Sequence, residues 1–183
     1  MSVGLIVLIA AAVLILLGLA HRVLDRMNLS DTGALLFLIA MVVGSFLPNI
    51  PLMRGEVSVS VNIGGALVPL ALVLYLLSRT RGQEVVRSLF ATVVVGVATY
   101  ALAQITDFDP GSTVLDPVWI YGVVAGVVGY LFGRSRRSAF ISGVLGLLIN
   151  DVVEAGRALA TKTRTDMIIG GAGVLDGIVL AGL

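Results

Sequence analysis

The stretch LFATVVVGVATYALAQI, at residues 89–105, contains no charged side chain. As an α-helix it would be about 25 Å long, close to the ~30 Å hydrocarbon thickness of a bilayer. The whole chain shares this character, because 58% of its 183 residues are hydrophobic and only 13% are charged. Soluble domains carry about 25% charged residues, since their surface faces water. The sequence therefore predicts an integral membrane protein whose main partner is the lipid bilayer.

Apolar runs separated by polar or charged turns divide the rest of the chain. Together with the first stretch, the runs are Val3–Ala20, Thr32–Leu47, Ile63–Leu77, Leu89–Ile105, Val118–Phe132, Ala139–Val153 and Met167–Leu183. A helix that crosses the bilayer needs about 17–25 residues, so several runs are short, and the last would span barely or remain within the protein. We expect an all-α integral membrane bundle of six to seven transmembrane segments, forming a single transmembrane domain over residues 1–183.

One segment breaks the helical pattern. Residues Glu56–Val61 alternate strictly between polar and apolar side chains, with valine at every second position. This is the period of a β-strand, and Pro48 and Pro51 prevent a helix just before it. We predict a short strand or hairpin over the outer face, that is, a short extracytoplasmic β element.

The placement of basic residues predicts the orientation. Arginines follow the first, third and fifth runs, whereas the loop after the fourth run contains three aspartates and no basic residue. Basic loops remain in the cytoplasm, which places the N-terminus outside. Arg157, Lys162 and Arg164 lie on the predicted outer side and do not fit this pattern. We expect a multi-pass protein of a prokaryotic cell membrane with an extracytoplasmic N-terminus.

Composition also excludes several classes of function. The net charge of +1 leaves no broad basic face for nucleic acid, so no nucleic-acid partner is expected. The chain has no cysteine, which excludes thiol catalysis and disulfides, and its single histidine excludes a site that needs two. We predict no metal and no cofactor.

Two aspartates lie within apolar runs, where a charged side chain costs roughly 2.5–3.5 kcal/mol. Asp151 is expected about 20 Å along the sixth run from the cytoplasmic side, and Asp176 about 14 Å into the seventh from the outside. The two carboxyls would then lie at similar depth on antiparallel neighbours. Two carboxyls in a low dielectric share one proton, so one acts as acid and the other as base. This suits aspartic proteolysis of a transmembrane peptide, with Asp151 and Asp176 as the catalytic pair.

Residues around the two aspartates are candidates for supporting roles. Asn150 would hold a water molecule or orient a carboxyl, and the glycines beside Asp176 would let a peptide or water approach closely. Ile63–Ala66 and Ile169–Ala172 both read Ile-Gly-Gly-Ala, which suggests a parallel repeat with a site at its interface. The predicted supporting residues are Asn150, Gly171, Gly173, Gly177, Asn62, Gly64, Gly65 and Pro69.

Other interpretations of the carboxyls stay open. In one, Asp151 ends its helix and pairs with Arg157 or Lys162, while Asp176 hydrogen-bonds to a neighbouring helix. In another, the same carboxyls form a relay in a small proton- or ion-coupled transporter or channel. A non-catalytic membrane subunit is the third.

A stripe of small residues runs along the fifth apolar run, at Gly122, Gly126, Gly129 and Gly133. Small residues at such spacing let helices pack closely. Packing within one chain is the preferred interpretation, and contact between copies in a homo-oligomer is the alternative.

In Val61–Pro69 and Ile169–Ile178 the chain resembles an uncharacterised family of small polytopic membrane proteins from bacteria and archaea, filed as a domain of unknown function. This resemblance implies a polytopic membrane fold and no particular activity. A looser resemblance is to the intramembrane aspartyl proteases of the presenilin and signal-peptide-peptidase kind. Those carry one aspartate on a span and a second in a Gly-x-Gly-Asp motif on the next. That resemblance implies catalysis by Asp151 and Asp176, although two residues separate Gly171–Gly173 from Asp176 here.

Overall fold

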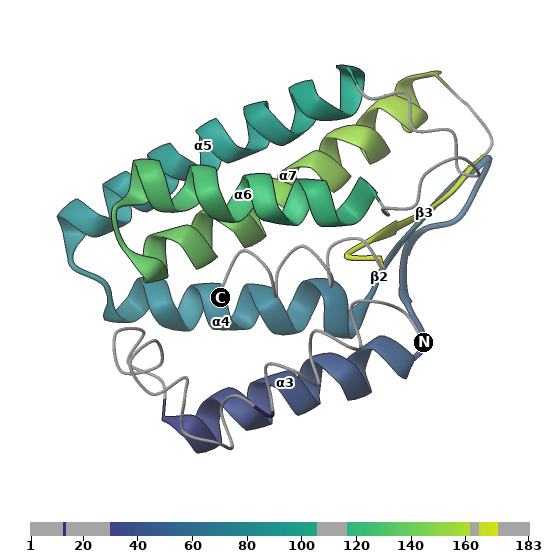
Figure 1. Cartoon of the computed structure of the whole chain (residues 1–183). Coiled ribbons are helices and arrows are strands. Elements are labelled where there is room, and N and C mark those ends of the chain that lie inside the picture. The colour runs from purple at the N-terminus through teal and green to yellow at the C-terminus, as the bar shows by residue number, and fades with distance from the viewer. Residues whose placement is uncertain (1–12, 14–29, 106–116, 162–164, 172–183) are drawn as a thin grey trace.

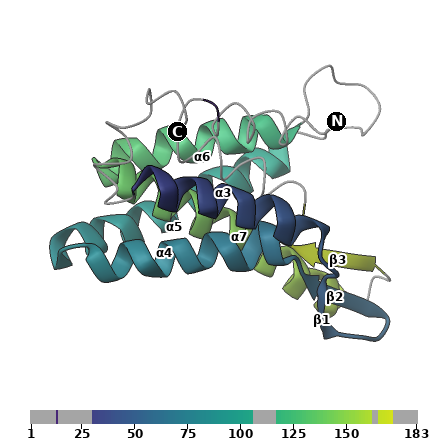
Figure 2. The ribbon, with the colours of Figure 1, turned by 90° about the horizontal axis from the view of Figure 1, so that it is seen from below.

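The computed structural model describes residues 13, 30–105, 117–161 and 165–171. Five α-helices, one π-helical turn and three strands make up this part of the chain (Figure 1). They are the helices α3 (Asp31–Phe46), α4 (Val68–Arg79), α5 (Gly82–Ile105), α6 (Pro117–Gly133) and α7 (Arg136–Thr161), the π-helical turn η1 (Ile63–Leu67), and the strands β1 (Ile50–Met53), β2 (Val57–Val61) and β3 (Thr165–Ile169). The helices lie side by side, and the strands form a small sheet at one end of the bundle (Figure 1 and Figure 2).

Small residues bring α6 into close contact with α7. A side chain on Gly129 would collide with the Ser142 hydroxyl, and one on Gly133 would collide with Ser138. Gly122 is buried as well. At Gly129 and Gly133, therefore, α7 of the same chain occupies the glycine stripe. A homo-oligomer through the stripe stays a prediction.

The helices α3 and α4 pack on the other side of α7. Met41, Val73 and Ile141 are fully buried where the three helices meet. Gly44 of α3 and Gly64 of η1 are in backbone contact, since a Cβ on Gly44 would lie 2.8 Å from the Gly64 nitrogen. No side chain fits into so close a contact, so the two glycines set the distance between α3 and η1.

The sheet has the strand order β1-β2-β3, with β1 antiparallel and β3 parallel to β2. The predicted hairpin is confirmed, because β1 and β2 form it over residues 50–61. The prediction that Met167 begins an apolar span is wrong, because Met167 lies in β3. Pairing with β2 satisfies the backbone groups of this segment, and the register runs from Val57 beside Thr165 to Val61 beside Ile169.

Two helices, α5 and α7, are long and apolar enough to cross a membrane. The helices α3 and α6 are apolar but shorter, with 16 and 17 residues. At 1.5 Å per residue they reach only about 24–26 Å. The described residues therefore do not support six to seven transmembrane segments. The first predicted run, Val3–Ala20, lies outside these residues apart from Val13.

Candidate functional site

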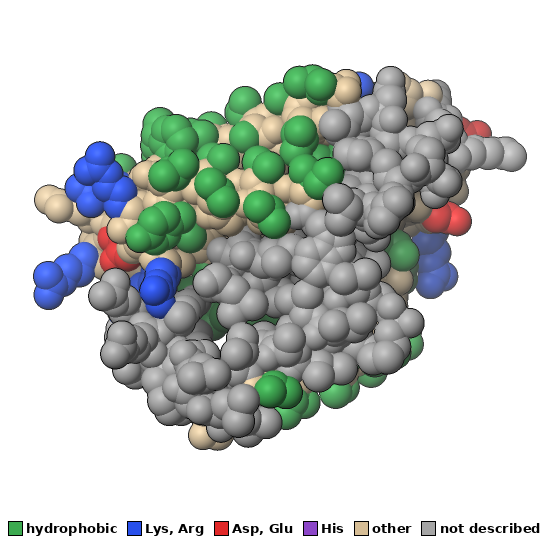
Figure 3. All heavy atoms as spheres, in the orientation of Figure 1, with side chains coloured by type: hydrophobic (Ala, Val, Ile, Leu, Met, Phe, Trp, Pro, Cys, Tyr) green, Lys and Arg blue, Asp and Glu red, His purple; other side chains and the backbone are tan. Residues whose placement is uncertain are grey.

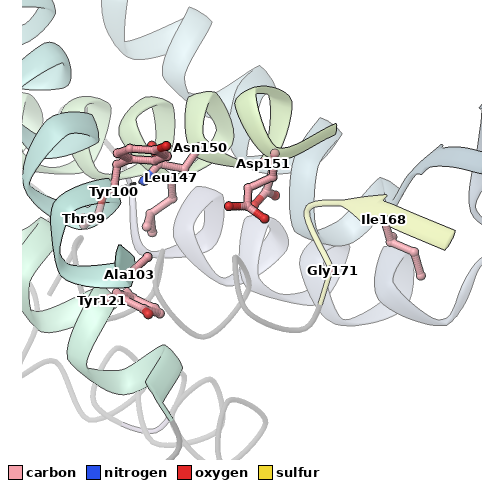
Figure 4. A pocket seen from close by; sticks show the side chains of 10 residues that line it. Thr99, Tyr100, Ala103, Tyr121, Leu147, Asn150, Asp151, Ile168 and Gly171 are labelled. Atoms are coloured by element: carbon pink, nitrogen blue, oxygen red, sulfur yellow. Dashed lines mark hydrogen bonds between the residues drawn. The ribbon is translucent and has the colours of Figure 1, made fainter. Parts of the chain in front are cut away.

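A cavity of about 390 Å³ lies where α5, α6 and α7 approach the sheet (Figure 4). Its lining residues are Thr99, Tyr100 and Ala103 of α5, Tyr121 of α6, Leu147, Asn150, Asp151 and Glu154 of α7, and Ile168 and Gly171 at the end of β3. Asn150, Asp151 and Gly171 were each predicted as site residues from the sequence. The fold brings these three to the lining of one cavity.

Asp151 binds the chain where β3 ends. Its Oδ2 accepts a hydrogen bond from the Gly170 N–H, with 2.9 Å between oxygen and nitrogen. Gly170 is buried and has a φ of 71°, a left-handed conformation that favours glycine. A buried N–H group needs an acceptor, and the Asp151 carboxylate supplies one. Asp151 therefore joins α7 to the turn that follows β3.

Asn150 is held in place by α5. Its Nδ2 donates a hydrogen bond to Thr99 Oγ1 at 2.7 Å, and Thr99 Oγ1 donates to the Val95 carbonyl oxygen at 2.8 Å. Thr99 is only 2% exposed, so this bond between helices lies inside the packed interface. The amide of Asn150 is therefore directed toward α5, whereas the Asp151 carboxylate is directed toward Gly170.

Arg157 does not neutralise Asp151. Its Nη1 donates a hydrogen bond to the Tyr100 hydroxyl at 2.7 Å, and its guanidinium carbon lies 5.9 Å from the centre of the Tyr100 ring. The interpretation in which Asp151 pairs with Arg157 is therefore wrong. Lys162, the other partner considered for Asp151, lies outside the described residues.

Glu154 is a second carboxylate of the cavity, and the sequence analysis missed it. It follows Asp151 by three residues on α7, so both side chains project from the same face of the helix. The predicted apolar run ended at Val153, whereas α7 continues to Thr161. The spacing of Asp151 and Glu154 was the signal that would have identified this residue.

Four of the predicted supporting residues do not line the cavity: Asn62, Gly64, Gly65 and Pro69. Asn62 begins η1, where its Oδ1 accepts from the Gly65 N–H at 2.8 Å, and its own N–H donates to the Ile169 carbonyl oxygen at 3.0 Å. A Cβ on Gly65 would overlap the Gly170 carbonyl oxygen. The two Ile-Gly-Gly-Ala segments are thus in contact, and they support the turn that Asp151 binds.

Three predicted site residues lie outside the described residues: Asp176, Gly173 and Gly177. The pairing of Asp151 with Asp176 therefore stays a prediction.

Comparison with known proteins identifies a family to which the sequence is similar. The sequence profile of a family described as "Protein of unknown function (DUF1614)" matches residues 20–183. This match confirms the resemblance to a domain of unknown function. No curated protein and no solved structure matches the chain.

Proposed function

This chain belongs to the DUF1614 family, and we propose that it is a multi-pass membrane hydrolase. Two aspartates, Asp151 and Asp176, would cleave a peptide bond within a transmembrane substrate. One observation carries the proposal: the Asp151 carboxylate binds the Gly170 N–H, six residues before Asp176 in the chain, beside a cavity with a partly polar wall.

The exposed surface of the helices supports a position in the bilayer. Figure 3 shows hydrophobic side chains along the outer faces of the helices. On α5, four of them are between 59% and 67% exposed: Val86, Phe90, Val93 and Val97. Water would penalise so continuous an apolar surface, whereas lipid chains solvate it.

The distribution of charge supports an orientation. The turns between α4 and α5 and between α6 and α7 lie at the end of the bundle opposite the sheet, and six arginines surround them. Near the sheet lie four described carboxylates, those of Glu56, Asp151, Glu154 and Asp166, against two described arginines, Arg54 and Arg157. Because basic turns remain in the cytoplasm, this arrangement favours a cytoplasmic arginine-rich end and an extracytoplasmic sheet.

The position of Gly170 supports an approach between the two aspartates. Six residues cover about 9 Å as a helix and about 20 Å as an extended chain, so Asp176 lies within that reach of Gly170. Gly171 lines the cavity, so the chain toward Asp176 starts from the cavity wall. Asp151 also lacks an ion pair within the described part of the chain, which leaves a carboxylate oxygen for a water molecule.

The proposed reaction begins with one carboxyl protonated and the other ionised. The ionised carboxylate takes a proton from a water molecule, whose oxygen attacks the carbonyl carbon of the peptide bond. The protonated carboxyl gives its proton to the carbonyl oxygen. When the tetrahedral intermediate collapses, one of its hydroxyl groups returns a proton to the second carboxylate as the C=O bond re-forms. The C–N bond breaks, and the nitrogen takes the proton from the first carboxyl, so both carboxyls regain their starting states. A cavity of about 390 Å³ has room for a water molecule of ~30 Å³ and a short length of peptide.

A cleavage assay tests this function. Purified protein would be reconstituted in liposomes with a transmembrane reporter peptide, and release of a fragment would be followed by mass spectrometry. Asp151→Asn and Asp176→Asn should each abolish release, because an amide cannot exchange the proton. Asp166→Asn is the matched control, since Asp166 lies in β3 outside the cavity wall and accepts from Ser58. Wild-type rates in either of the first two variants would overturn the proposal.

Glu154 favours a second candidate function, a relay for protons or cations in a small transporter. Glu154 and Asp151 line the same cavity about one helical turn apart, so a proton or cation can pass between them. In liposomes that contain a pH-sensitive dye, Glu154→Gln should then abolish flux driven by a pH gradient. Asp176→Asn should leave that flux intact, and no peptide would be cut.

A further inference from the structure

Six arginines gather at the end of the bundle opposite the sheet, and Figure 3 shows Lys and Arg side chains collected there. We call these residues the basic end: Arg79, Arg81, Arg87, Arg134, Arg136 and Arg137. Ser135 Oγ donates a hydrogen bond to Glu84 Oε1 at 2.5 Å, which joins the two turns. Against these six arginines, the described acidic residues at this end include Glu84 and Asp31, which begins α3. The local charge is therefore strongly positive.

Arg136 has hydrogen-bonding capacity that the described part of the chain does not use. Its Nη1 is buried and donates no hydrogen bond to a described residue. A buried cationic donor without an acceptor raises the free energy of the folded state, and an anionic group would remove that penalty. The planar guanidinium matches two oxygens of a phosphate group in particular.

An apolar surface adjoins the basic end. Phe90 and Phe132 are 59% and 46% exposed, with 6.2 Å between their ring centres. Phe132 precedes Arg134 by two residues, so apolar and basic surfaces meet there. Inorganic phosphate and nucleic acid would use only the arginines. A molecule with an anionic head and an apolar body would use both surfaces.

We propose that the basic end binds the headgroup of an anionic phospholipid. Arg136 contacts the phosphate, the neighbouring arginines supply the surrounding positive charge, and an acyl chain lies against Phe90 and Phe132. This inference rests on the position in the bilayer proposed above. It does not depend on the chemistry of Asp151, which lies at the other end of the bundle.

Thermal unfolding of the purified protein in a neutral detergent tests this inference. The unfolding temperature would be followed while phosphatidylglycerol, phosphatidylcholine with the same acyl chains, or glycerol phosphate is added. Phosphatidylglycerol should stabilise the wild-type protein at lower concentration than the other two. A basic residue near an anionic surface contributes about fivefold in affinity, so Arg136→Gln should weaken this binding by about that factor. The matched control is Arg54→Gln, in the β1–β2 hairpin at the sheet end.

Two further variants keep the inference testable if Arg136→Gln does not fold. Arg134→Gln removes an exposed charge of the basic end, and it should also weaken phosphatidylglycerol binding. Phe90→Ala should weaken binding of the lipid but not of glycerol phosphate. Equal stabilisation by the two lipids, or equal loss in Arg54→Gln and Arg134→Gln, would overturn the inference. Binding of glycerol phosphate as tight as that of the lipid would also overturn the inference. None of these results would affect the outcome of the cleavage assay on Asp151.

Discussion

Replacing Asp151 separates its role in the fold from its role in chemistry. Asp151→Ala removes the acceptor of the Gly170 N–H, which is buried and bonded at 2.9 Å. A buried donor left without a partner costs about 1–3 kcal/mol. For a chain of this length, each kcal/mol lowers the unfolding temperature by about 2–4 °C. We therefore expect Asp151→Ala to unfold about 2–12 °C below the wild-type protein.

Asp151→Asn should behave differently, because its amide oxygen can still accept from Gly170. Its unfolding temperature should lie close to that of the wild-type protein, while the proposed cleavage is lost. Glu154→Ala is the matched control on the same helix and cavity, since the Glu154 side chain has no hydrogen bond to a described residue. Its loss should change stability by less than about 0.5 kcal/mol. The unfolding temperatures would be measured by differential scanning fluorimetry in detergent. Equal temperatures for Asp151→Ala and the wild-type protein would refute the structural role of this hydrogen bond.

Two predictions concern glycines. Gly65→Ala should destabilise the protein by about 1–3 kcal/mol, because its Cβ would overlap the Gly170 carbonyl oxygen; Gly82→Ala, which meets open space, should be neutral in the same thermal unfolding measurement. Gly129→Leu should destabilise the folded monomer, because α7 lies against this position, and size exclusion in detergent should show less of the monomer. Gly156→Leu, at a position that meets open space, should leave the monomer unchanged. A folded Gly129→Leu monomer would contradict the packing of α6 on α7.

Much of the fold was predictable from local patterns. The strict alternation of Glu56–Val61 predicts a strand on its own, and β2 is found there. β3 was not predictable, because its five residues form a strand only beside β2, and the partner lies 108 residues earlier in the chain. The apolar composition of Met167–Leu183 favoured a helix over that pairing. Pairing with β2, a distant segment of the chain, therefore decided the conformation of β3.

Part of the candidate site was likewise predictable from the sequence, and part was not. A carboxyl within an apolar run is costly, and this cost alone identified Asp151 as a site residue. The hydrogen-bond donor to Asp151 could not be identified from the sequence, because the Gly170 N–H is a backbone group that every residue except proline possesses. The repeated Ile-Gly-Gly-Ala did mark the correct segment, since Gly65 and Gly170 are in contact. Glu154 was missed because the apolar run ended one residue before it, although the helix did not.

The central claim, that Asp151 and Asp176 form one site, can be measured directly by cross-linking. The chain contains no cysteine, so Asp151→Cys together with Asp176→Cys creates one defined pair of thiols. A disulfide requires Cα atoms about 4.4–6.8 Å apart. The account predicts that this pair becomes oxidised rapidly in liposomes, as seen by mass spectrometry after proteolysis, whereas Gly55→Cys with Asp176→Cys does not. The absence of a cross-link in a folded Asp151→Cys, Asp176→Cys protein would contradict it.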